Sequence, residues 1–442
     1  MSRPPPRPDH ADTATAAQDR DAARGLAIDL LVGVLNDGQM LDEQPFAQHS
    51  TPEQRARARR LVLACLRDLQ RADAVLNPLL RKPPPPHLHA LLRLSVVEIL
   101  TLDAPAHAVV QAAVTTARAQ QGGSAMAGLV NAVLRRAATT EAQTWAALPP
   151  GRLPGWLRRR LGAAYGKDAV AGIEAAHHAG APLDLTLPPM PAAERDALTQ
   201  ALDTAAGPVQ ALPGGSLRLG AGVQVSALPG YAEGRWWVQD AAAALPATLL
   251  AAQVDEAVLD LCAAPGGKTM QLAATGAQVT ALDRSARRLE RLRANLARTG
   301  LVAETVCADA LDWQPPAPVD AVLLDAPCTA TGTIRRHPEL PQIRKPAGLQ
   351  ALTDLQAQLI DTAAGFLRPG GRLVYCTCSL LPQEGEDQLA AALARNPGLT
   401  LAPHPPLPLG APAAKGGWRT RPDDPALADG MDGFFMVLLQ KA

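Results

Sequence analysis

The second half of the chain alternates short apolar segments with stretches of helical pattern. From about residue 236 onward the apolar segments read AVLDLCA, AQVTALD, VAETVCAD, VDAVLLDAP and GRLVYCT. Such alternation favours a parallel sheet with helices on both faces, because parallel strands need a crossover connection and the crossover is usually a helix. The sequence therefore predicts an α/β domain over residues 236–442.

The residues before this domain divide into three parts. Residues 1–20 are rich in Pro, Asp, Thr and Ala and have no apolar period, which predicts a disordered arm. Over residues 21–145 apolar side chains recur at i, i+3, i+4 and i+7, which predicts an all-α domain. A Pro-rich stretch, ALPPGRLPGW, closes this block, and the mixed strand and helix signals of residues 146–235 predict a small α/β insert.

Length and composition limit the class of protein. The chain has 442 residues and is 47% hydrophobic, which allows several domains with buried cores. Its six cysteines are too sparse for a disulfide scaffold, its first residues lack a secretory apolar core, and no apolar run approaches the ~20 residues of a membrane span. We therefore expect a soluble, cytoplasmic protein. Lys plus Arg and Asp plus Glu both number 42, so attraction to nucleic acid must come from local basic patches.

The segment DLCAAPGGKT, residues 260–269, follows the first of the apolar strands. Small residues and paired glycines before a helix give a tight turn whose backbone can approach a ligand closely. The spacing matches neither GxGxxG nor GxxxxGK[ST], which disfavours a pyrophosphate site. The glycines alone leave two interpretations open, a cofactor loop and an ordinary strand-to-helix turn.

Acidic residues at the next two strand ends favour the cofactor loop. Asp283 ends the second strand about 20 residues after the turn, where a carboxylate typically receives ribose hydroxyls. Asp309 follows the third strand at the same edge. Each acid alone is readily explained as a helix N-cap. Together with the small turn they describe a pocket for a ribose and an adenine, as in S-adenosylmethionine sites.

Three cysteines lie at the ends of the fourth and fifth strands. Cys328 follows Asp325 in LLDAPCTATGT, where a doubly wound sheet opens its crevice. Cys376 and Cys378 lie in GRLVYCTCSL. Strand alternation places these two on one face, unless the strand ends before Cys378. All three thiols are therefore expected near the same edge of the sheet.

Packing, metal binding and nucleophilic catalysis are the possible roles of these cysteines. Packing is the general default for cysteine, and we assign it to Cys65, Cys262 and Cys307. A zinc site is disfavoured because neither a CxxC pair nor a nearby His-x-His pair accompanies the other three, so no metal is expected. For Cys328, Cys376 and Cys378 a reactive thiolate remains the better interpretation.

Methyl transfer to carbon 5 of a pyrimidine explains why such a site needs sulfur. That carbon is too electron-poor to attack a sulfonium methyl group. If a thiolate adds to carbon 6, carbon 5 becomes nucleophilic, and loss of its proton after methylation lets the sulfur leave. A second cysteine could assist release as an acid or base. The residues alone do not decide whether Cys328 or Cys378 is the nucleophile.

Four motifs give the chain a family resemblance. DLCAAPGGKT, LLDAPCTATGT, YCTCSLLPQE and MDGFFMVLLQK together resemble the RNA cytosine C5-methyltransferases of the NOL1/NOP2/Sun group, and the N-terminal block resembles the NusB-like RNA-binding domain of one bacterial branch. The resemblance implies a Rossmann-like methyltransferase fold, S-adenosylmethionine as methyl donor and 16S ribosomal RNA as substrate, with the site numbered 967 as the candidate cytosine. We further expect a monomer, and the lack of a long apolar run predicts no membrane association.

Residue roles follow from the matched motifs. The cysteine of TCS, here Cys378, corresponds to the nucleophile, and Cys328 of DAPC corresponds to the cysteine that assists release. Asp325 lies at the border of cofactor and target base and is counted with the catalytic residues. The expected cofactor contacts are Cys262, Ala263, Ala264, Pro265, Gly266, Gly267, Lys268, Asp283, Arg288, Asp309 and Asp325.

Basic segments are the expected RNA contacts, because phosphate neutralisation supplies most nonspecific affinity. The candidates are Arg158, Arg159 and Arg160 in the insert and Arg335, Arg336 and His337 after the fourth strand, with Arg344 and Lys345 beyond them. The cluster beside Cys328 is the better placed, since a target base must be turned out of its helix into the pocket. For any single arginine, a solvated surface position is the plainer interpretation.

The sequence departs from the family pattern at two places, and several alternative functions remain open. Cys376 occupies a position that is commonly Ser or Ala, and the usual acidic PEEN reads PQEGED here. Neither change removes a catalytic group, although an extra thiol could make the site easier to oxidise. The alternatives are another rRNA or tRNA cytosine C5-methyltransferase, a small-molecule or protein methyltransferase, and a noncatalytic RNA-binding or assembly protein.

Overall fold

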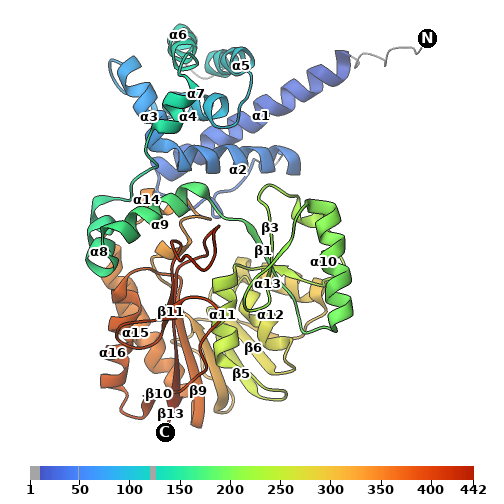
Figure 1. Cartoon of the computed structure of the whole chain (residues 1–442), viewed down its shortest axis with the longest axis vertical. Coiled ribbons are helices and arrows are strands. Elements are labelled where there is room, and N and C mark those ends of the chain that lie inside the picture. The colour runs from blue at the N-terminus through green and yellow to red at the C-terminus, as the bar shows by residue number, and fades with distance from the viewer. Residues whose placement is uncertain (1–9, 48, 120–125) are drawn as a thin grey trace, which may run out of the picture. The chain divides into compact units, whose positions relative to one another are not determined.

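The structure is a computed structural model that describes residues 10–47, 49–119 and 126–442 (Figure 1). It divides into two compact units. The first unit runs to Gly155 and also includes His337–Arg344, whereas the second comprises Trp156–Arg336 and Lys345–Ala442. The chain therefore leaves the first unit, returns to it for one short segment, and leaves it again.

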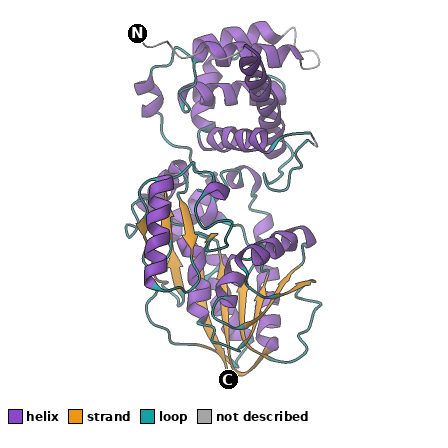
Figure 2. Cartoon of the chain, turned by 90° about the vertical axis from the view of Figure 1, so that its right-hand side faces the viewer, coloured by secondary structure: helices purple, strands orange, loops and turns teal. Residues whose placement is uncertain are grey.

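The first unit is helical in the part of the chain that the structure describes (Figure 2). Leucine, valine and alanine side chains at helical spacing form its core, among them Leu31, Leu91 and Leu134. Thr51 and Gln54 form a capping box at the start of the second helix. Its α-helices are α1 His10–Leu35, α2 Pro52–Arg67, α3 Leu69–Leu76, α4 Pro86–Leu100, α5 Ala106–Ala119, α6 Ala127–Ala137 and α7 Ala142–Ala147, with a 3-10 turn at Asn77–Leu79.

The expected disordered arm is corrected by the first helix. Residues 1–9 lie outside the described residues, but residues 10–20 belong to α1. The sequence ATAAQDRDAA in this stretch is rich in alanine, which has the highest intrinsic helix propensity. Low hydrophobicity was therefore a poor guide to the backbone conformation here.

A short helix from the second half of the sequence completes the helical unit. Helix α14, Leu340–Ile343, belongs to the segment that joins this unit. Leu340 and Glu339 are buried, and Ile343 packs against the helical core. The first unit is thus built from two separate stretches of chain.

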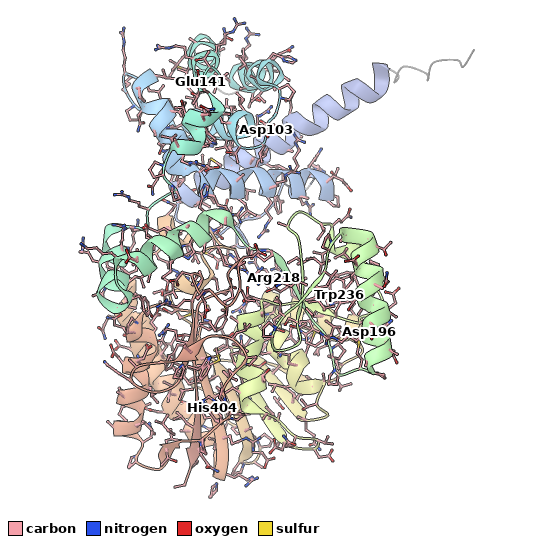
Figure 3. The ribbon with its side chains drawn as sticks, viewed as in Figure 1. Asp103, Glu141, Asp196, Arg218, Trp236 and His404 are labelled. Atoms are coloured by element: carbon pink, nitrogen blue, oxygen red, sulfur yellow. The ribbon has the colours of Figure 1, made fainter. Side chains whose placement is uncertain are left out.

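The second unit begins with two helices and a small antiparallel sheet. Strand β1 pairs with β3 and β4, and β3 pairs with β2, while one face packs Leu185, Leu217 and Trp236 against a helix. Figure 3 labels Arg218 and Trp236 in this region. The elements are α8 Gly155–Tyr165, α9 Lys167–Ala179, β1 Leu183–Thr186, α10 Ala192–Ala206, β2 Gln210–Ala211, β3 Leu217–Leu219, β4 Trp237–Val238 and a 3-10 turn at Val225–Ala227.

The large sheet has nine strands in the order β11-β12-β13-β9-β8-β5-β6-β7, with β10 paired to β13. The run from β9 to β7 is parallel, as the alternation of strands and helices predicts. The C-terminal edge is antiparallel, which the prediction of a parallel sheet missed. The strands are β5 Ala257–Leu261, β6 Gln278–Asp283, β7 Glu304–Cys307, β8 Val319–Asp325, β9 Leu367–Thr377, β10 Leu399–Leu401, β11 Ala411–Pro412, β12 Trp418–Thr420 and β13 Phe434–Lys441.

Helices cover both faces of this sheet. Val258, Leu323 and Met436 point to the face that packs against α11, whereas their neighbours Leu259 and Val322 point to the face under α15 and α16. The period of two along each strand therefore explains why nearly every strand residue is apolar. The helices are α11 Ala241–Leu250, α12 Gly267–Ala273, α13 Ala286–Thr299, α15 Gly348–Phe366 and α16 Glu386–Arg395, with 3-10 turns at Thr331–Thr333 and Pro382–Glu384.

The strand order fixes where a ligand can enter. Strand β5 lies between β6 and β8, so the connections leave it in opposite directions. A doubly wound sheet opens its crevice at the carboxyl ends of the strands beside this switch point. Among the described residues, the helices include none that combines the length and the apolar character of a membrane span.

Candidate active site

The turn after β5 has the tight geometry that its small residues suggest. Cys262 has a φ of 61° and Gly266 a φ of 103°, both in the left-handed region. A Cβ atom at Gly266 would come within 2.8 Å of Leu292, so a side chain there would displace α13 as well as strain the backbone. The turn therefore holds its backbone in one compact course between β5 and α12.

Asp283 and Arg288 brace this turn from the next strand and helix. The Asp283 carboxylate accepts hydrogen bonds from the backbone N–H groups of Ala264 at 3.2 Å and Ser285 at 2.9 Å. Arg288 forms an ion pair with Asp283 at 3.4 Å and donates a hydrogen bond to the carbonyl of Ala264. Because Asp283 is only 2% exposed, it shapes the turn from within.

Asp309 lies beyond β7 and is the exposed acid of this edge. The strand ends at Cys307, two residues earlier than the predicted strand end. The Asp309 carboxylate accepts a hydrogen bond from the N–H of Leu311 at 3.0 Å. It thus caps a local turn and keeps acceptor capacity for a ligand.

Lys268 and Asp325 form the central charged pair of the site. Lys268 Nζ donates to Asp325 Oδ2 at 2.8 Å and lies 5.2 Å from the centre of the Phe434 ring. Burial alone would lower the pKa of Lys268, but the Asp325 carboxylate outweighs it and raises that pKa above its ordinary value. The Asp325 side chain remains 31% exposed. Lys268 therefore neutralises one oxygen of this carboxylate, while the side chain as a whole remains partly exposed.

The strand β9 ends at Thr377, which separates the roles of Cys376 and Cys378. Cys376 lies inside the strand, is buried in the core, and its thiol donates to Asp325 Oδ1 with the atoms 3.6 Å apart. Burial and the charge of Asp325 raise the pKa of the Cys376 thiol well above its ordinary value. Cys376 is thus an inert neighbour of the charged pair, whereas Cys378 stands past the strand and is partly exposed.

Cys328 and Cys378 meet across adjacent strands. Their sulfur atoms are 3.4 Å apart, so one thiol can donate a hydrogen bond to the other. The hydrogen bond to Cys378 and the burial of Cys328 raise the pKa of Cys328 well above its ordinary value. Cys328 therefore keeps its proton at neutral pH. It is better suited to act as an acid than as a nucleophile.

Glu384 is a polar residue of this site that the sequence motifs did not single out. It follows β9 in a 3-10 turn and is fully buried. Its carboxylate accepts hydrogen bonds from Thr329, Ser379 and Gln356. The only signal in the sequence was an acid six residues after Cys378, in the segment PQEGED.

Arg335 and Arg336 pair with buried acids, which corrects the expectation that they form a basic surface for RNA. The Arg335 side chain is 0% exposed and that of Arg336 is 23% exposed. Arg335 pairs with Asp432 at 3.0 Å, and Arg336 pairs with Asp240 at 2.6 Å and with Asp432 at 3.0 Å. Burial requires such pairing, so these arginines join distant segments.

The pKa values of the two acids in this arginine cluster shift in opposite directions. Burial opposes ionisation of Asp240, but Arg336 and Arg335 outweigh it and lower the pKa of Asp240. Burial and the charge of Asp240 raise the pKa of Asp432 to about 7. The cluster therefore favours Asp240 as the ionised partner of the arginines.

The remaining RNA candidates differ in exposure. Arg158 is paired with Glu174 at 3.0 Å, Arg159 is exposed and Arg160 is partly exposed. His337 lies in the segment that belongs to the helical unit, with its Nδ1 atom 3.4 Å from Glu339. Arg159 is thus the most accessible of the predicted arginines in the insert.

The three cysteines assigned to packing have different environments. Cys65 is fully buried, and burial raises its pKa. Cys262 is partly buried in the turn, where burial raises its pKa to about 12. Cys307 is exposed, so packing is the wrong assignment for it. Within the described residues, no group of three or more His, Cys, Asp or Glu side chains is arranged to hold a metal ion.

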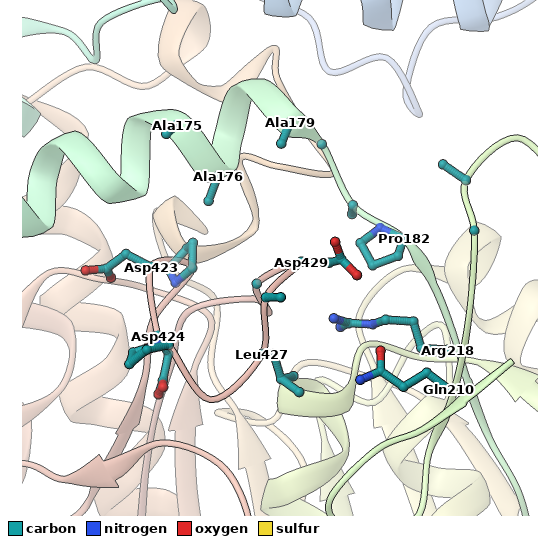
Figure 4. A pocket seen from close by; sticks show the side chains of 18 of the residues that line it. Ala175, Ala176, Ala179, Pro182, Gln210, Arg218, Asp423, Asp424, Leu427 and Asp429 are labelled. Atoms are coloured by element: carbon teal, nitrogen blue, oxygen red, sulfur yellow. The ribbon is translucent and has the colours of Figure 1, made fainter. Parts of the chain in front are cut away.

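A separate cavity of about 850 Å³ lies in the second unit. It is bounded by α9, the small sheet and the loop of residues 422–430 (Figure 4). Arg218 reaches its wall while paired with Asp184 at 2.7 Å, and the carbonyl of Asp429 in the opposite wall accepts a hydrogen bond from Arg335. None of the predicted cofactor residues lines this cavity, which distinguishes it from the turn after β5.

Comparison with known proteins places both units in described families. The family model for the 16S rRNA methyltransferases RsmB/F matches residues 247–440, and the model for the NusB family matches residues 21–139. The first match covers the large sheet and its cysteine loops, and the second covers the helical unit.

Relatives match nearly the whole length of the chain. A ribosomal RNA small subunit methyltransferase B from Xanthomonas campestris is 38% identical over 98% of this chain and 99% of its own. A protein of the same description from Vibrio cholerae is 35% identical over 95% of this chain and 97% of its own. The crystal structure of PH0851 matches with a TM-score of 0.75 and 23% identity over 96% of this chain and 99% of that chain, which supports the fold.

Proposed function

Because this chain belongs to the family of 16S rRNA methyltransferases RsmB/F, we propose that it methylates carbon 5 of a cytosine in 16S ribosomal RNA. S-adenosylmethionine is the methyl donor, as the family and the fold require. The candidate target is the cytosine numbered 967. We further propose a cytoplasmic monomer with an RNA-binding helical domain over residues 21–145, an insert over 146–235 and the methyltransferase domain over 236–442.

The turn after β5 fits the donor. Its left-handed residues bring the backbone close to the crevice, Asp283 and Arg288 brace it, and the exposed carboxylate of Asp309 can accept hydrogen bonds from a nucleoside. When bound, S-adenosylmethionine supplies an electrophilic methyl group on a sulfonium centre. The chain itself supplies the groups that make the acceptor carbon reactive.

Cys378 is the nucleophile in this proposal. Its sulfur donates an electron pair to carbon 6 of the cytosine, forming a C–S bond and shifting electron density toward carbon 5. After methylation, removal of the proton on carbon 5 restores the ring double bond and breaks the C–S bond. Cys328, 3.4 Å from Cys378, is placed to serve as the acid or base in the release step. Asp325 and Lys268 border the same crevice and orient the ring.

The single observation that carries the proposal is this meeting of two thiols at the carboxyl ends of β8 and β9. The residues alone left the choice of nucleophile open, and the raised pKa of buried Cys328 supports Cys378 in that role. A protein or small-molecule methyltransferase would have no need of the sulfur pair. A noncatalytic RNA-binding protein would have no need of the paired Lys268 and Asp325 either.

Two cysteine variants test the proposal with RNA transcribed from the 16S gene. Cys378→Ala should abolish methyl transfer, because no covalent bond to carbon 6 can form. Cys328→Ala should accumulate a protein–RNA adduct that survives a denaturing gel. Bisulfite sequencing of the wild-type product then identifies the modified cytosine. Full activity of Cys378→Ala would overturn the covalent mechanism, and no adduct with Cys328→Ala would overturn the release role.

A further inference from the structure

We propose that Glu384 is a positioning residue whose buried carboxylate holds the two cysteine loops at the separation that covalent methyl transfer needs. The inference rests on the proposed function for its consequence in catalysis. Its geometric content, that Glu384 sets the distance between Cys328 and Cys378, stands independently of any substrate.

The hydrogen bonds of Glu384 link residues on both loops. Thr329, which follows Cys328, donates to Oε1 through its backbone N–H at 2.8 Å and to Oε2 through its hydroxyl. Ser379, which follows Cys378, donates its hydroxyl to Oε2 at 2.5 Å. One carboxylate therefore binds the residue directly after each of the two cysteines.

The neighbours of Glu384 extend this connection to the strand and to a helix. Gln356 of α15 donates to Glu384 Oε1 at 3.1 Å and to the carbonyl of Pro327 at 2.8 Å. The carbonyl of Glu384 accepts hydrogen bonds from the hydroxyls of Tyr375 at 2.8 Å and Thr377 at 3.0 Å. Residues on both sides of Cys328 and the end of β9 thus converge on one buried residue.

The donors around this carboxylate make its chemical type specific. A glutamine at this position would have to turn an N–H₂ group toward one pair of partners. Toward Oε1 it would meet the N–H groups of Thr329 and Gln356, which cannot accept. In the Oε2 position the N–H₂ group would face the hydroxyls of Thr329 and Ser379, which would lose their acceptor. The Ser379 hydroxyl already accepts a hydrogen bond from the N–H of Leu381. Leaving buried donors unpaired is costly, so the loops would shift.

The loops should nevertheless stay folded without this carboxylate. The N–H of Gly332 donates to the carbonyl of Cys378 at 2.9 Å, and the N–H of Leu380 donates to the hydroxyl of Thr331 at 2.9 Å. These bonds tie the loops together without Glu384. We therefore expect Glu384→Gln to be a folded variant with altered spacing of the two sulfur atoms.

Disulfide trapping measures this spacing in the full chain without RNA or cofactor. Diamide oxidises two thiols to a disulfide and is itself reduced to a hydrazine, and the reaction needs the Cβ atoms about 3.5–4.5 Å apart. Wild-type protein should form the Cys328–Cys378 disulfide, identified by peptide mapping. Glu384→Gln should form it at least about tenfold more slowly, because small displacements of reacting groups have large effects on rate.

Two matched variants separate spacing from charge and from general stability. Glu256→Gln removes a carboxylate that pairs with Arg372 outside the site, and should trap within about twofold of wild type. Glu384→Asp keeps the negative charge but is one methylene shorter, so it cannot reach both loops and should trap slowly as well. Trapping at the wild-type rate in Glu384→Gln would overturn the inference, as would a failure of wild-type protein to form this disulfide.

Single-turnover methylation tests the consequence for catalysis. Glu384→Gln should lower the rate of methyl transfer at saturating RNA at least about tenfold while KM for RNA stays within about twofold, since no RNA contact is changed. A purely structural role would lower the folded fraction and leave the rate per folded molecule unchanged, and that result would overturn the inference. If wild-type protein traps the disulfide yet methylates no RNA, the proposed function fails while the positioning role stands.

Discussion

Two charged regions of the second unit pair basic side chains with aspartates and have different roles. Lys268 and Asp325 at the sheet edge form one pair whose carboxylate remains 31% exposed. In the arginine cluster Arg335 is buried, Arg336 is 23% exposed, and both pair with the buried acids Asp240 and Asp432. The difference teaches that a charge left partly open is available for chemistry, whereas a charge enclosed by partners holds segments together.

The largest expected effect comes from breaking the enclosed cluster. Arg335→Leu leaves Asp432 buried with one arginine fewer, so unfolding free energy should fall by about 3–5 kcal/mol. Denaturant unfolding measures this loss. Methyl transfer per folded molecule should change little at a temperature where the variant is folded. A variant as stable as wild type would mean that the cluster does not hold the fold.

The converse change removes the open charge. Asp325→Asn should lower methyl transfer about 10²-fold, in the range found for loss of one group that stabilises developing charge. Its unfolding free energy should fall by less than that of Arg335→Leu, because the asparagine oxygen can still accept the hydrogen bond that the buried Lys268 donates. Paired kinetic and denaturation measurements test both halves. A stability loss comparable with that of Arg335→Leu would erase the distinction between the regions.

The pH dependence of stability should differ in sign between Asp260, near the first region, and Asp240 of the arginine cluster. Burial raises the pKa of Asp260, which lies in β5 beneath the site, from 3.8 to about 7. The folded chain thus holds this proton more tightly than the unfolded chain, and this stabilisation is lost as the pH rises from about 4 through 7. Asp240 has a lowered pKa, so its contribution is instead lost as the pH falls.

Denaturation at a series of pH values measures this difference. The stability of Asp260→Asn relative to wild type should increase between about pH 4 and pH 8, because asparagine cannot ionise. The stability of Asp240→Asn relative to wild type should instead decrease as the pH rises toward about 4 and stay level above it, because the pKa of Asp240 is lowered and the wild-type carboxylate is fully ionised by then. Parallel curves for the two variants would contradict the assigned directions.

The smallest effect concerns RNA affinity. Arg159→Ala removes an exposed arginine and should weaken RNA binding by a few-fold while reducing the salt slope by about 1. Folded Arg335→Leu should leave the salt slope unchanged, because its guanidinium is enclosed. Filter binding at several salt concentrations compares the two. Equal slopes in the two variants would show that exposure does not decide which arginines meet RNA.

Local patterns predicted much of the fold and of the site. The parallel strands, the small turn after β5 and the cysteine loops all follow from short contiguous motifs, since strand ends of a parallel sheet meet at one edge. The end of β9 at Thr377 sets Cys378 apart from Cys376. It depends on the pairing with β13, so the hydrophobic periodicity of the sequence could not predict it.

Partners that are distant in sequence explain what was missed. Arg335 and Arg336 read as a basic surface patch because their acids are about 95 residues away in either direction, Asp240 before them and Asp432 after. The sequence showed Glu384 only as an acid near Cys378 and did not indicate its role, because its partner Thr329 is 55 residues away and the bonds form only after the sheet is assembled. Burial of charge is a property of tertiary packing, which no local pattern displays.

The return of the chain to the helical unit at α14 has a consequence for dissection of this protein. A fragment that begins at residue 156 still contains Leu340 and Ile343 but lacks the helices that bury them. The fragment would therefore expose a hydrophobic patch on the segment that follows Cys328. Separating the two units therefore requires breaks at three places, after residues 155, 336 and 344, and a simple truncation is expected to yield a protein that self-associates.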